Sequence, residues 1–322
     1  MRNIGGEIEL KREDGFHYVT DSGRSSLRLI LSSETMKGKK CLLPDFLCAS
    51  IITVFLDQKI PFAFYHVNAD LSPDLDSIFS QTFDALYLID YFGHRPTLSS
   101  FTGRGLIVIE DGVFLPEIEL NDSFAAWAGF NSFRKITPAA DGSVVRSTFP
   151  LPDEKIKMAA APFAAVKYEG RHRKYDYLYN GTETEEVFLG KIRNGEKLID
   201  EQKEIYRLSD TGFLALSHFF KTFDHERRTR IRNLRFVAEE LSRYAIPIKP
   251  DFPSVFVLSV DRRDELREYL FSRNIFLPVH WPASDNVSNP LYSRIISIPV
   301  DSRYDFADLL RVTMEIRDFL NG

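Results

Sequence analysis

Short apolar runs alternate with helix-like stretches along the chain up to Asp153. The apolar runs are nearly continuous, which is typical of strands buried on both faces of a parallel sheet. Parallel strands need crossover connections, and helices usually supply them. The pattern therefore predicts an α/β fold with helices on both faces of a mainly parallel sheet. The expected strands cover 40–44, 62–67, 85–92, 105–111, 124–130 and 142–146, and the expected helices cover 25–37, 46–58 and 73–80.

Charged amphipathic stretches dominate after Asp153 and predict long helices, which cover 154–167, 185–206 and 210–243. A smaller set of elements follows, with strands over 254–260, 275–281 and 295–300 and helices over 264–273 and 304–320. This change of pattern predicts two domains, a larger one over residues 1–215 and a small C-terminal α+β domain over residues 216–322.

Composition and charge narrow the class of protein. With 322 residues, of which 44% are hydrophobic and 27% charged, the chain is long and apolar enough for two packed domains. A net charge of −5 argues against a nucleic-acid binder with a broadly basic surface. The basic clusters at 171–174 and 226–232 are therefore expected to be solvated helix faces.

The sequence also indicates where the protein is located and whether it binds a metal. Residues 1–14 contain no apolar signal core, and no run approaches the length of a membrane span. We therefore expect a cytoplasmic protein without a membrane segment. Two cysteines, Cys41 and Cys48, are too few for a disulfide framework and lack the partners of a metal site, so no metal is expected.

The first candidate site is the turn that opens the first expected helix, in DSGRSS (21–26). Ser22 and Gly23 form the turn, and Arg24 and Ser25 follow it. A helix start has free N–H groups and the positive end of the helix dipole, so this segment can cradle an anion such as phosphate. It can equally be a capped helix with Ser22 as the cap.

Two acids and a lysine come at the ends of expected strands. Asp111 ends the strand over 105–111, where its carboxylate can pair with a cationic ring nitrogen or cap the next turn. Asp90 comes near the end of another strand, and His94 after it is most simply a loop residue. Lys135 follows the apolar run over 124–130, where an ammonium group is costly to desolvate. This lysine either reaches solvent or takes part in a reaction.

Pyridoxal 5′-phosphate (PLP) needs an anion site, a carboxylate beside its pyridine nitrogen and a lysine that forms a Schiff base. The chain offers these three features in order. It resembles the fold type I PLP enzymes, which have an aspartate-aminotransferase-like fold, and among them the DegT/StrS-like family of sugar aminotransferases. The resemblance spans most of the chain and rests on SGRSSL (22–27), LLPDFLCASII (42–52), FYHVNADLSPD (64–74), VIED (108–111), SFRK (132–135), YRLSD (206–210) and VHWP (279–282).

The resemblance implies roles for the matching residues. Lys135 would be the Schiff-base lysine and proton shuttle, and Asp111 would keep the pyridine nitrogen protonated. Cys48 stands where relatives carry an aromatic residue that stacks on the ring, and the nearby Phe46 is an alternative. The cofactor-binding residues implied in this way are Ser22, Gly23, Arg24, Ser25, Phe46, Cys48, Asp90, Asp111, Phe114, Ser132 and Lys135.

The resemblance also implies a reaction, the transfer of an amino group from an amino-acid donor to a keto acceptor. A nucleotide-linked ketosugar is the expected acceptor, and a homodimer with shared active sites is the expected assembly. Three positions depart from the family, with Asp90 in place of His, Phe114 in place of Gln or His, and Ile205 in place of Asn. They keep two alternatives open: another PLP reaction, such as elimination or decarboxylation, and a catalytically idle protein with the PLP fold.

Overall fold

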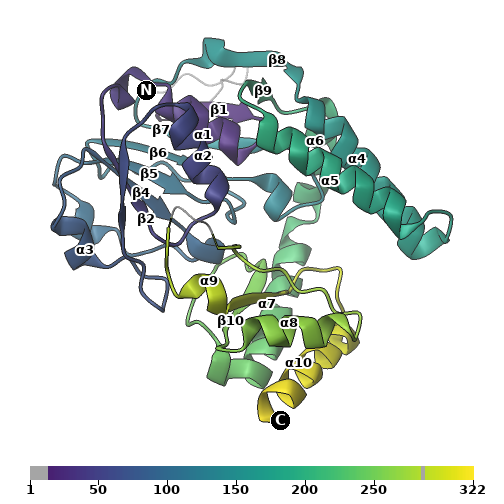
Figure 1. Ribbon diagram of the computed structural model, residues 1–322. Helices are drawn as coiled ribbons and strands as arrows, with labels where there is room; N and C mark the ends of the chain where they lie inside the picture. The colour runs from purple at the N-terminus through teal and green to yellow at the C-terminus, as the bar shows by residue number, and fades with distance from the viewer. Residues whose placement is uncertain (1–13, 284–286) are drawn as a thin grey trace, which may run out of the picture.

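The computed structural model describes residues 14–283 and 287–322 and is built around a seven-stranded sheet (Figure 1). The strands lie in the order β1–β7–β6–β5–β4–β2–β3. Neighbours from β3 to β6 are parallel, and β7 pairs antiparallel with β6 and β1. The expected mainly parallel α/β sheet is therefore confirmed. The strands are β1 (Phe16–Thr20), β2 (Cys41–Pro44), β3 (Phe62–Tyr65), β4 (Ala85–Ile89), β5 (Ile107–Asp111), β6 (Ala126–Phe130) and β7 (Ser143–Ser147).

The hydrophobic pattern does not predict strand β1. Its residues Phe16 and Val19 are 40% and 44% exposed, and only Thr20 at its end is buried. The strand exists because it pairs along its whole length with β7, from Phe16 opposite Ser147 to Thr20 opposite Ser143. A strand at the sheet edge with exposed side chains gives no periodic apolar signal, so the sequence alone leaves it unassigned.

Helices α1 (Gly23–Leu31), α2 (Ala49–Asp57) and α3 (Leu75–Phe79) follow β1, β2 and β3. Every residue of α1 except Arg24 is buried, and the buried Arg28 is paired with Asp57 at 3.5 Å. All residues of β4 and β5 are buried too. The core therefore lies along the central strands, and it fixes the strand ends and the start of α1 relative to one another.

The helices expected after Asp153 are wrong in their extents. Residues 156–160 form a strand, β8, which pairs in parallel with a second unexpected strand, β9. A proline at the first helical position starts the next helix, because its missing N–H would have no intrahelical acceptor there. The long helix expected over 210–243 breaks at Thr222. The elements are β8 (Ile156–Ala160), α4 (Pro162–Tyr175), α5 (Glu185–Glu201), β9 (Ile205–Arg207), α6 (Asp210–Lys221) and α7 (Phe223–Leu241).

The C-terminal part packs around a core of its own, which includes Val237 from α7 and Leu258 from a two-stranded antiparallel sheet. Residues 275–281 are irregular, so the strand expected there is wrong. Pro278 lies in the middle of this segment and cannot donate to a ladder, although its carbonyl accepts from the Ser297 N–H at 3.1 Å. The elements are β10 (Val255–Ser259), α8 (Arg263–Phe271), α9 (Leu291–Arg294), β11 (Ile295–Pro299) and α10 (Phe306–Asn321).

The arrangement in Figure 1 places the C-terminal elements below the large sheet, whereas α4 and α5 form a hairpin that extends to one side. Residue 216, where we place the start of the small domain, lies inside α6. Within the two ranges that the structure describes, no helix is long and apolar enough to cross a membrane. Residues 1–13, which contributed to the expectation about signal sequences, lie outside these ranges.

The basic cluster at 226–232 is a solvated face only in part. Arg227, Arg228 and Arg232 are exposed as expected, but two charged residues of the cluster are buried. Arg230 and Glu226 on α7 are only 4% and 8% exposed. They form an ion pair of 2.6 Å with each other. The charge pattern of a helix does not reveal which of its faces another segment will cover, and here only the face with Glu226 and Arg230 is turned inward.

Candidate active site

The start of α1 presents backbone N–H groups to the interior. Ser22 is the N-cap, and its Oγ accepts from the N–H of Ser25 at 3.3 Å. The first N–H groups of a helix have no intrahelical acceptor, so those of Gly23 and Arg24 are available to a ligand. A Cβ on Gly23 would lie 3.3 Å from the Asn131 carbonyl oxygen. Glycine therefore suits this close approach between α1 and the chain after β6.

A cavity of about 380 Å³ lies beside this helix start, at the carboxyl ends of the parallel strands. Sites in open α/β sheets form at this edge, because the loops after neighbouring strands meet there. Eight of the expected residues line the cavity: Ser22, Gly23, Arg24, Cys48, Asp111, Phe114, Ser132 and Lys135. The wall also includes Trp281, from the VHWP stretch that the resemblance rests on. Sequence reasoning missed the other wall residues, namely Ser50, Ile51, Ile89, Val113, Phe130, Arg134, Glu196, Ile199 and Asp200.

Asp111, the last residue of β5, forms one wall of the cavity and is only 3% exposed. Tyr87 on the neighbouring strand donates its hydroxyl hydrogen to Asp111 Oδ2 at 2.5 Å, and the Val113 N–H donates to Oδ1 at 3.2 Å. Burial raises the pKa of Asp111 to about 6, although the two hydrogen bonds and the charge of Lys135 act in the opposite direction. Such a carboxyl group can share a proton with a ring nitrogen near neutral pH.

Lys135 closes a short helical turn, Phe133–Lys135, directly after β6. The side chain keeps accessible surface, and it belongs to the cavity wall. Separation from bulk water lowers the pKa of Lys135 to about 8, and the charge of Arg134 adds to this effect, while Cys48 and Glu196 oppose it. Part of the amine is then neutral at neutral pH, as attack on a carbonyl carbon requires.

Helix α5 adds two acids to the same cavity. Asp200 pairs with Arg24 at 2.6 Å, and Glu196 pairs with Arg134 at 3.3 Å and also with Lys167. Burial alone would raise the pKa of Glu196, but the charges of Arg134 and Lys167 hold it at about 2. The cations at the anion-binding end of the cavity therefore already have carboxylate partners. No local sequence signal could have revealed this, because α5 comes long after the other wall residues.

Three expected cofactor-binding residues lie outside the cavity wall. Phe46 is fully buried, and its ring packs against Trp281 with centroids 5.2 Å apart, so it supports an aromatic residue that does line the cavity. Ser25 is buried at the start of α1 and receives a hydrogen bond from Gln202 at 3.2 Å. Asp90 is buried within the protein, as described next.

Asp90 has no exposed surface, and neither carboxylate oxygen has a hydrogen-bond partner within the described ranges. Burial raises the pKa of Asp90 well above its usual value, and the neighbouring charge of Glu110 raises it further. Glu110 in turn accepts a hydrogen bond from the Trp127 indole at 2.9 Å. Burial and the nearby charge of Glu110 therefore favour the protonated form of Asp90.

The cavity fits PLP in the chemistry of its donor groups. Asp111 provides a buried carboxyl group for a ring nitrogen, Lys135 provides an amine that is partly neutral, and the start of α1 provides N–H groups for a phosphate. Phe114 and Trp281 add aromatic surface to the wall. These features arise from separate parts of the chain, and the fold brings them to one place.

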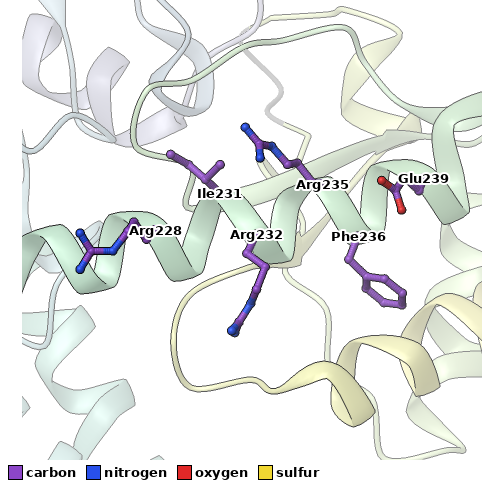
Figure 2. Close-up of a pocket in the computed structure, with 6 residues that line it drawn as sticks. All are labelled: Arg228, Ile231, Arg232, Arg235, Phe236 and Glu239. Carbon is purple, nitrogen blue, oxygen red and sulfur yellow. The ribbon is translucent and has the colours of Figure 1, made fainter.

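Another cavity, of about 520 Å³, lies along α7 and is shown in Figure 2. Its wall consists of α7 side chains alone, among them Arg228, Arg232 and Arg235. These three arginines point in different directions from the helix rather than toward one centre. This surface groove therefore lacks the convergent groups of an active site, and the strand-end cavity remains the candidate.

Comparison with known proteins gives no match to any protein-family profile and none to a curated protein sequence. Similar solved structures include S. venezuelae DesV in complex with a ketimine intermediate, with a TM-score of 0.66, 16% identity and coverage of 95% of this chain and 85% of DesV. A DegT DnrJ EryC1 StrS aminotransferase from Brucella abortus has a TM-score of 0.64 at 17% identity, with coverage of 94% and 85%.

Helicobacter pylori PseC, an aminotransferase involved in the biosynthesis of pseudoaminic acid, has a TM-score of 0.66 at 13% identity. The similarity covers 95% of this chain and 86% of PseC. Because it extends over nearly the whole chain at such low identity, it concerns the fold. The chain thus has the fold type I architecture of PLP-dependent aminotransferases, as seen in the DegT/DnrJ/EryC1/StrS type of sugar aminotransferase.

Proposed function

We propose that this protein is a PLP-dependent aminotransferase that moves an amino group from an amino-acid donor to a keto acceptor. The observation that carries the proposal is the convergence of Lys135, Asp111 and the start of α1 on one cavity. The structural similarity to aminotransferases over nearly the whole chain supports it.

Each of these groups has a defined task in the proposed reaction. When bound, PLP supplies an electron sink for the bonds at the substrate amine carbon. Lys135 would be the residue that holds the cofactor, and its Nζ would move the proton at the substrate carbon. Asp111 would hold a proton at the pyridine nitrogen. The N–H groups of Gly23 and Arg24 would bind the phosphate, with the hydroxyl groups of Ser22 and Ser132 as further candidate donors.

We further propose a nucleotide-linked ketosugar as the amino acceptor. Among the similar structures, DesI was solved in the presence of its TDP-sugar product, and CalS13 from Micromonospora echinospora is described as a sugar aminotransferase. DesI has a TM-score of 0.64 at 14% identity to this chain. The acceptor is the finer part of the proposal, because a fold shared at this identity is compatible with other keto substrates.

One observation favours a second candidate, a protein that holds the cofactor without turnover. Both arginines of the cavity are paired with acids of α5, Arg24 with Asp200 and Arg134 with Glu196. They are therefore less available to a substrate carboxylate or diphosphate. The two candidates differ in the half-reaction, since only the aminotransferase converts bound pyridoxal to pyridoxamine when an amino donor is added.

The test is an absorbance spectrum of the purified protein with PLP. The wild-type protein should show the visible band of a lysine-linked pyridoxal, and glutamate or another effective donor should abolish this band. Lys135→Ala should lack the band, whereas Lys203→Ala, which changes an exposed lysine paired with Asp57 at 3.1 Å, should retain it. An unchanged spectrum in Lys135→Ala would contradict the proposal, because another lysine would then hold the cofactor.

The proposed assembly is a homodimer with shared active sites. Phe213 and Leu214 on α6 are 63% and 67% exposed and line a groove together with Val19 of β1. Apolar side chains with this exposure are suited to burial against a second copy of the chain. Light scattering on the purified protein measures the mass in solution, and a monomer at micromolar concentration would contradict this part of the proposal.

A further inference from the structure

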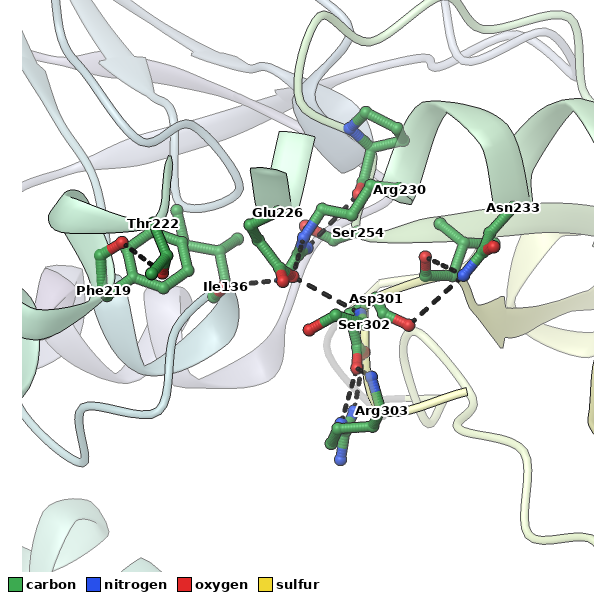
Figure 3. A network of polar contacts seen from close by, with 12 residues as sticks. Ile136, Phe219, Thr222, Glu226, Arg230, Asn233, Ser254, Asp301, Ser302 and Arg303 are labelled. Carbon is green, nitrogen blue, oxygen red and sulfur yellow. Dashed lines mark hydrogen bonds and ion pairs between the residues drawn. The ribbon is translucent and has the colours of Figure 1, made fainter. Parts of the chain in front are cut away.

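The turn that carries Lys135 is anchored from a distant part of the chain. Its carboxyl end is Ile136, whose carbonyl oxygen accepts a hydrogen bond of 2.9 Å from Arg230 Nη2 (Figure 3). Arg230 lies on α7 and is separated from Ile136 by 94 positions in the chain. A charged donor therefore holds the residue next to Lys135.

The guanidinium group of Arg230 also makes several other contacts. It is 4% exposed, and its Nε donates to Glu226 Oε1 at 2.6 Å. Its Nη1 lies 3.2 Å from both the Pro253 carbonyl oxygen and Ser254 Oγ, just before strand β10. The guanidinium also lies 4.5 Å from the centre of the Phe252 ring. One planar group thus joins three segments: the Lys135 turn, helix α7 and the entry to β10.

We propose that Arg230 is a positioning residue, which fixes the Lys135 turn to the entry of the C-terminal sheet and so sets where the lysine amine lies. This inference rests on the proposed function, since it concerns the reaction of Lys135. It goes beyond that function because Arg230 does not line the cavity, and the sequence pattern placed it only in a basic cluster that was expected to be solvated.

The planar fork of arginine is suited to this task. Its five N–H donors have fixed directions, so three partners can be held at once, whereas a lysine ammonium is a point charge on a flexible stem. An arginine that only joined α7 to the entry of β10 would not need the hydrogen bond to the Ile136 carbonyl oxygen. If this link is lost, the turn at Lys135 gains freedom, and the amine samples positions that do not reach the bound aldehyde.

The experiment compares Arg230→Gln and Arg230→Lys with Arg263→Gln as the matched control. Arg263 is also a buried arginine, 7% exposed, and donates to the carbonyl oxygens of Ile295 at 3.1 Å and Tyr292 at 2.9 Å. Arg263→Gln therefore reports the loss of a structural arginine elsewhere in the C-terminal part. Thermal unfolding of all variants measures stability separately from the behaviour of Lys135.

Two readouts follow Lys135 directly. The first is the rate at which the visible PLP band forms, together with the pH midpoint of that band. The second is the pH dependence of labelling of the Lys135 amine by trinitrobenzenesulfonate without cofactor, located by peptide mass spectrometry. We expect Arg230→Gln to slow band formation about tenfold and to move the labelling midpoint by about half a pH unit or more. Arg230→Lys should fall between this variant and the wild type.

The control should lose thermal stability without a change in either readout. Wild-type rates and midpoints in folded Arg230→Gln would overturn the inference, as would equal changes in Arg263→Gln. Should Arg230→Gln fail to fold, Arg230→Lys takes its place with the same criteria. Absence of any PLP band in the wild-type protein would contradict the proposed function instead, and the labelling measurement would still decide the role of Arg230.

Discussion

The reactivity of Lys135 should rise steeply toward pH 8, because its amine has a pKa of about 8 in the cavity instead of the ordinary 10.5. At pH 7, a pKa of 8 leaves about 9% of the amine neutral, whereas a pKa of 10.5 leaves about 0.03%. The structure therefore predicts that Lys135 has about 300 times more of its amine in the neutral, nucleophilic form at pH 7 than a lysine with the ordinary pKa. Desolvation of the amine inside the cavity is the main cause, and the neighbouring charge of Arg134 contributes.

A single substitution tests the electrostatic part of this reasoning. The carboxylate of Glu196 raises the pKa of Lys135, so Glu196→Gln should lower it further. Glu196 also pairs with Arg134 and Lys167. In Glu196→Gln the positive charges of these two residues are no longer balanced by the carboxylate, so they repel the Lys135 ammonium more strongly. The matched control is Glu201→Gln, which changes an exposed acid on the same helix that faces Lys197 at 3.7 Å.

The assay is the rate of trinitrobenzenesulfonate labelling at Lys135 between about pH 6 and about pH 10, resolved by peptide mass spectrometry. The wild-type protein and Glu201→Gln should share a midpoint near pH 8, and Glu196→Gln should have a lower one. A wild-type midpoint near the ordinary lysine value would refute the assignment of Lys135 to a desolvated cavity. A higher midpoint in Glu196→Gln would refute the charge argument alone.

Two further predictions concern acids near the site. Asp90 keeps its proton in the folded protein, whereas the unfolded chain releases it above about pH 3.9, so stability falls as pH rises from there toward the raised pKa. Asp90→Asn, which is neutral at every pH, should therefore gain stability relative to the wild type between about pH 4 and about pH 7 in urea unfolding, and equal differences at both pH values would contradict this. Asp200→Asn removes the carboxylate that occupies an arginine of the cavity, and it should tighten the binding of PLP and inorganic phosphate about threefold to tenfold, but not that of pyridoxal, in calorimetric titrations. Tighter binding of all three ligands would point to a change other than the loss of charge.

The sequence already contains the local features of the fold and of the site. The central strands are continuous apolar runs, and their order with the intervening helices was enough to predict a mainly parallel sheet. Gly23, Asp111 and Lys135 could be identified as candidates because each is a polar or flexible residue next to an end of a predicted helix or strand. Their convergence follows from topology, since the carboxyl ends of parallel strands share one edge.

The sequence by itself thus determined the fold class and the candidate reactive groups, whereas the tertiary structure decided how these groups are surrounded. The pairing of β8 with β9, the acids that α5 places in the cavity and the burial of Arg230 all depend on contacts between residues far apart in the chain. A charged residue on an amphipathic helix has the same sequence signature whether water or another segment covers it. Only the packed structure distinguishes the two cases, because burial and ion pairing are properties of the assembled surfaces and not of the local pattern.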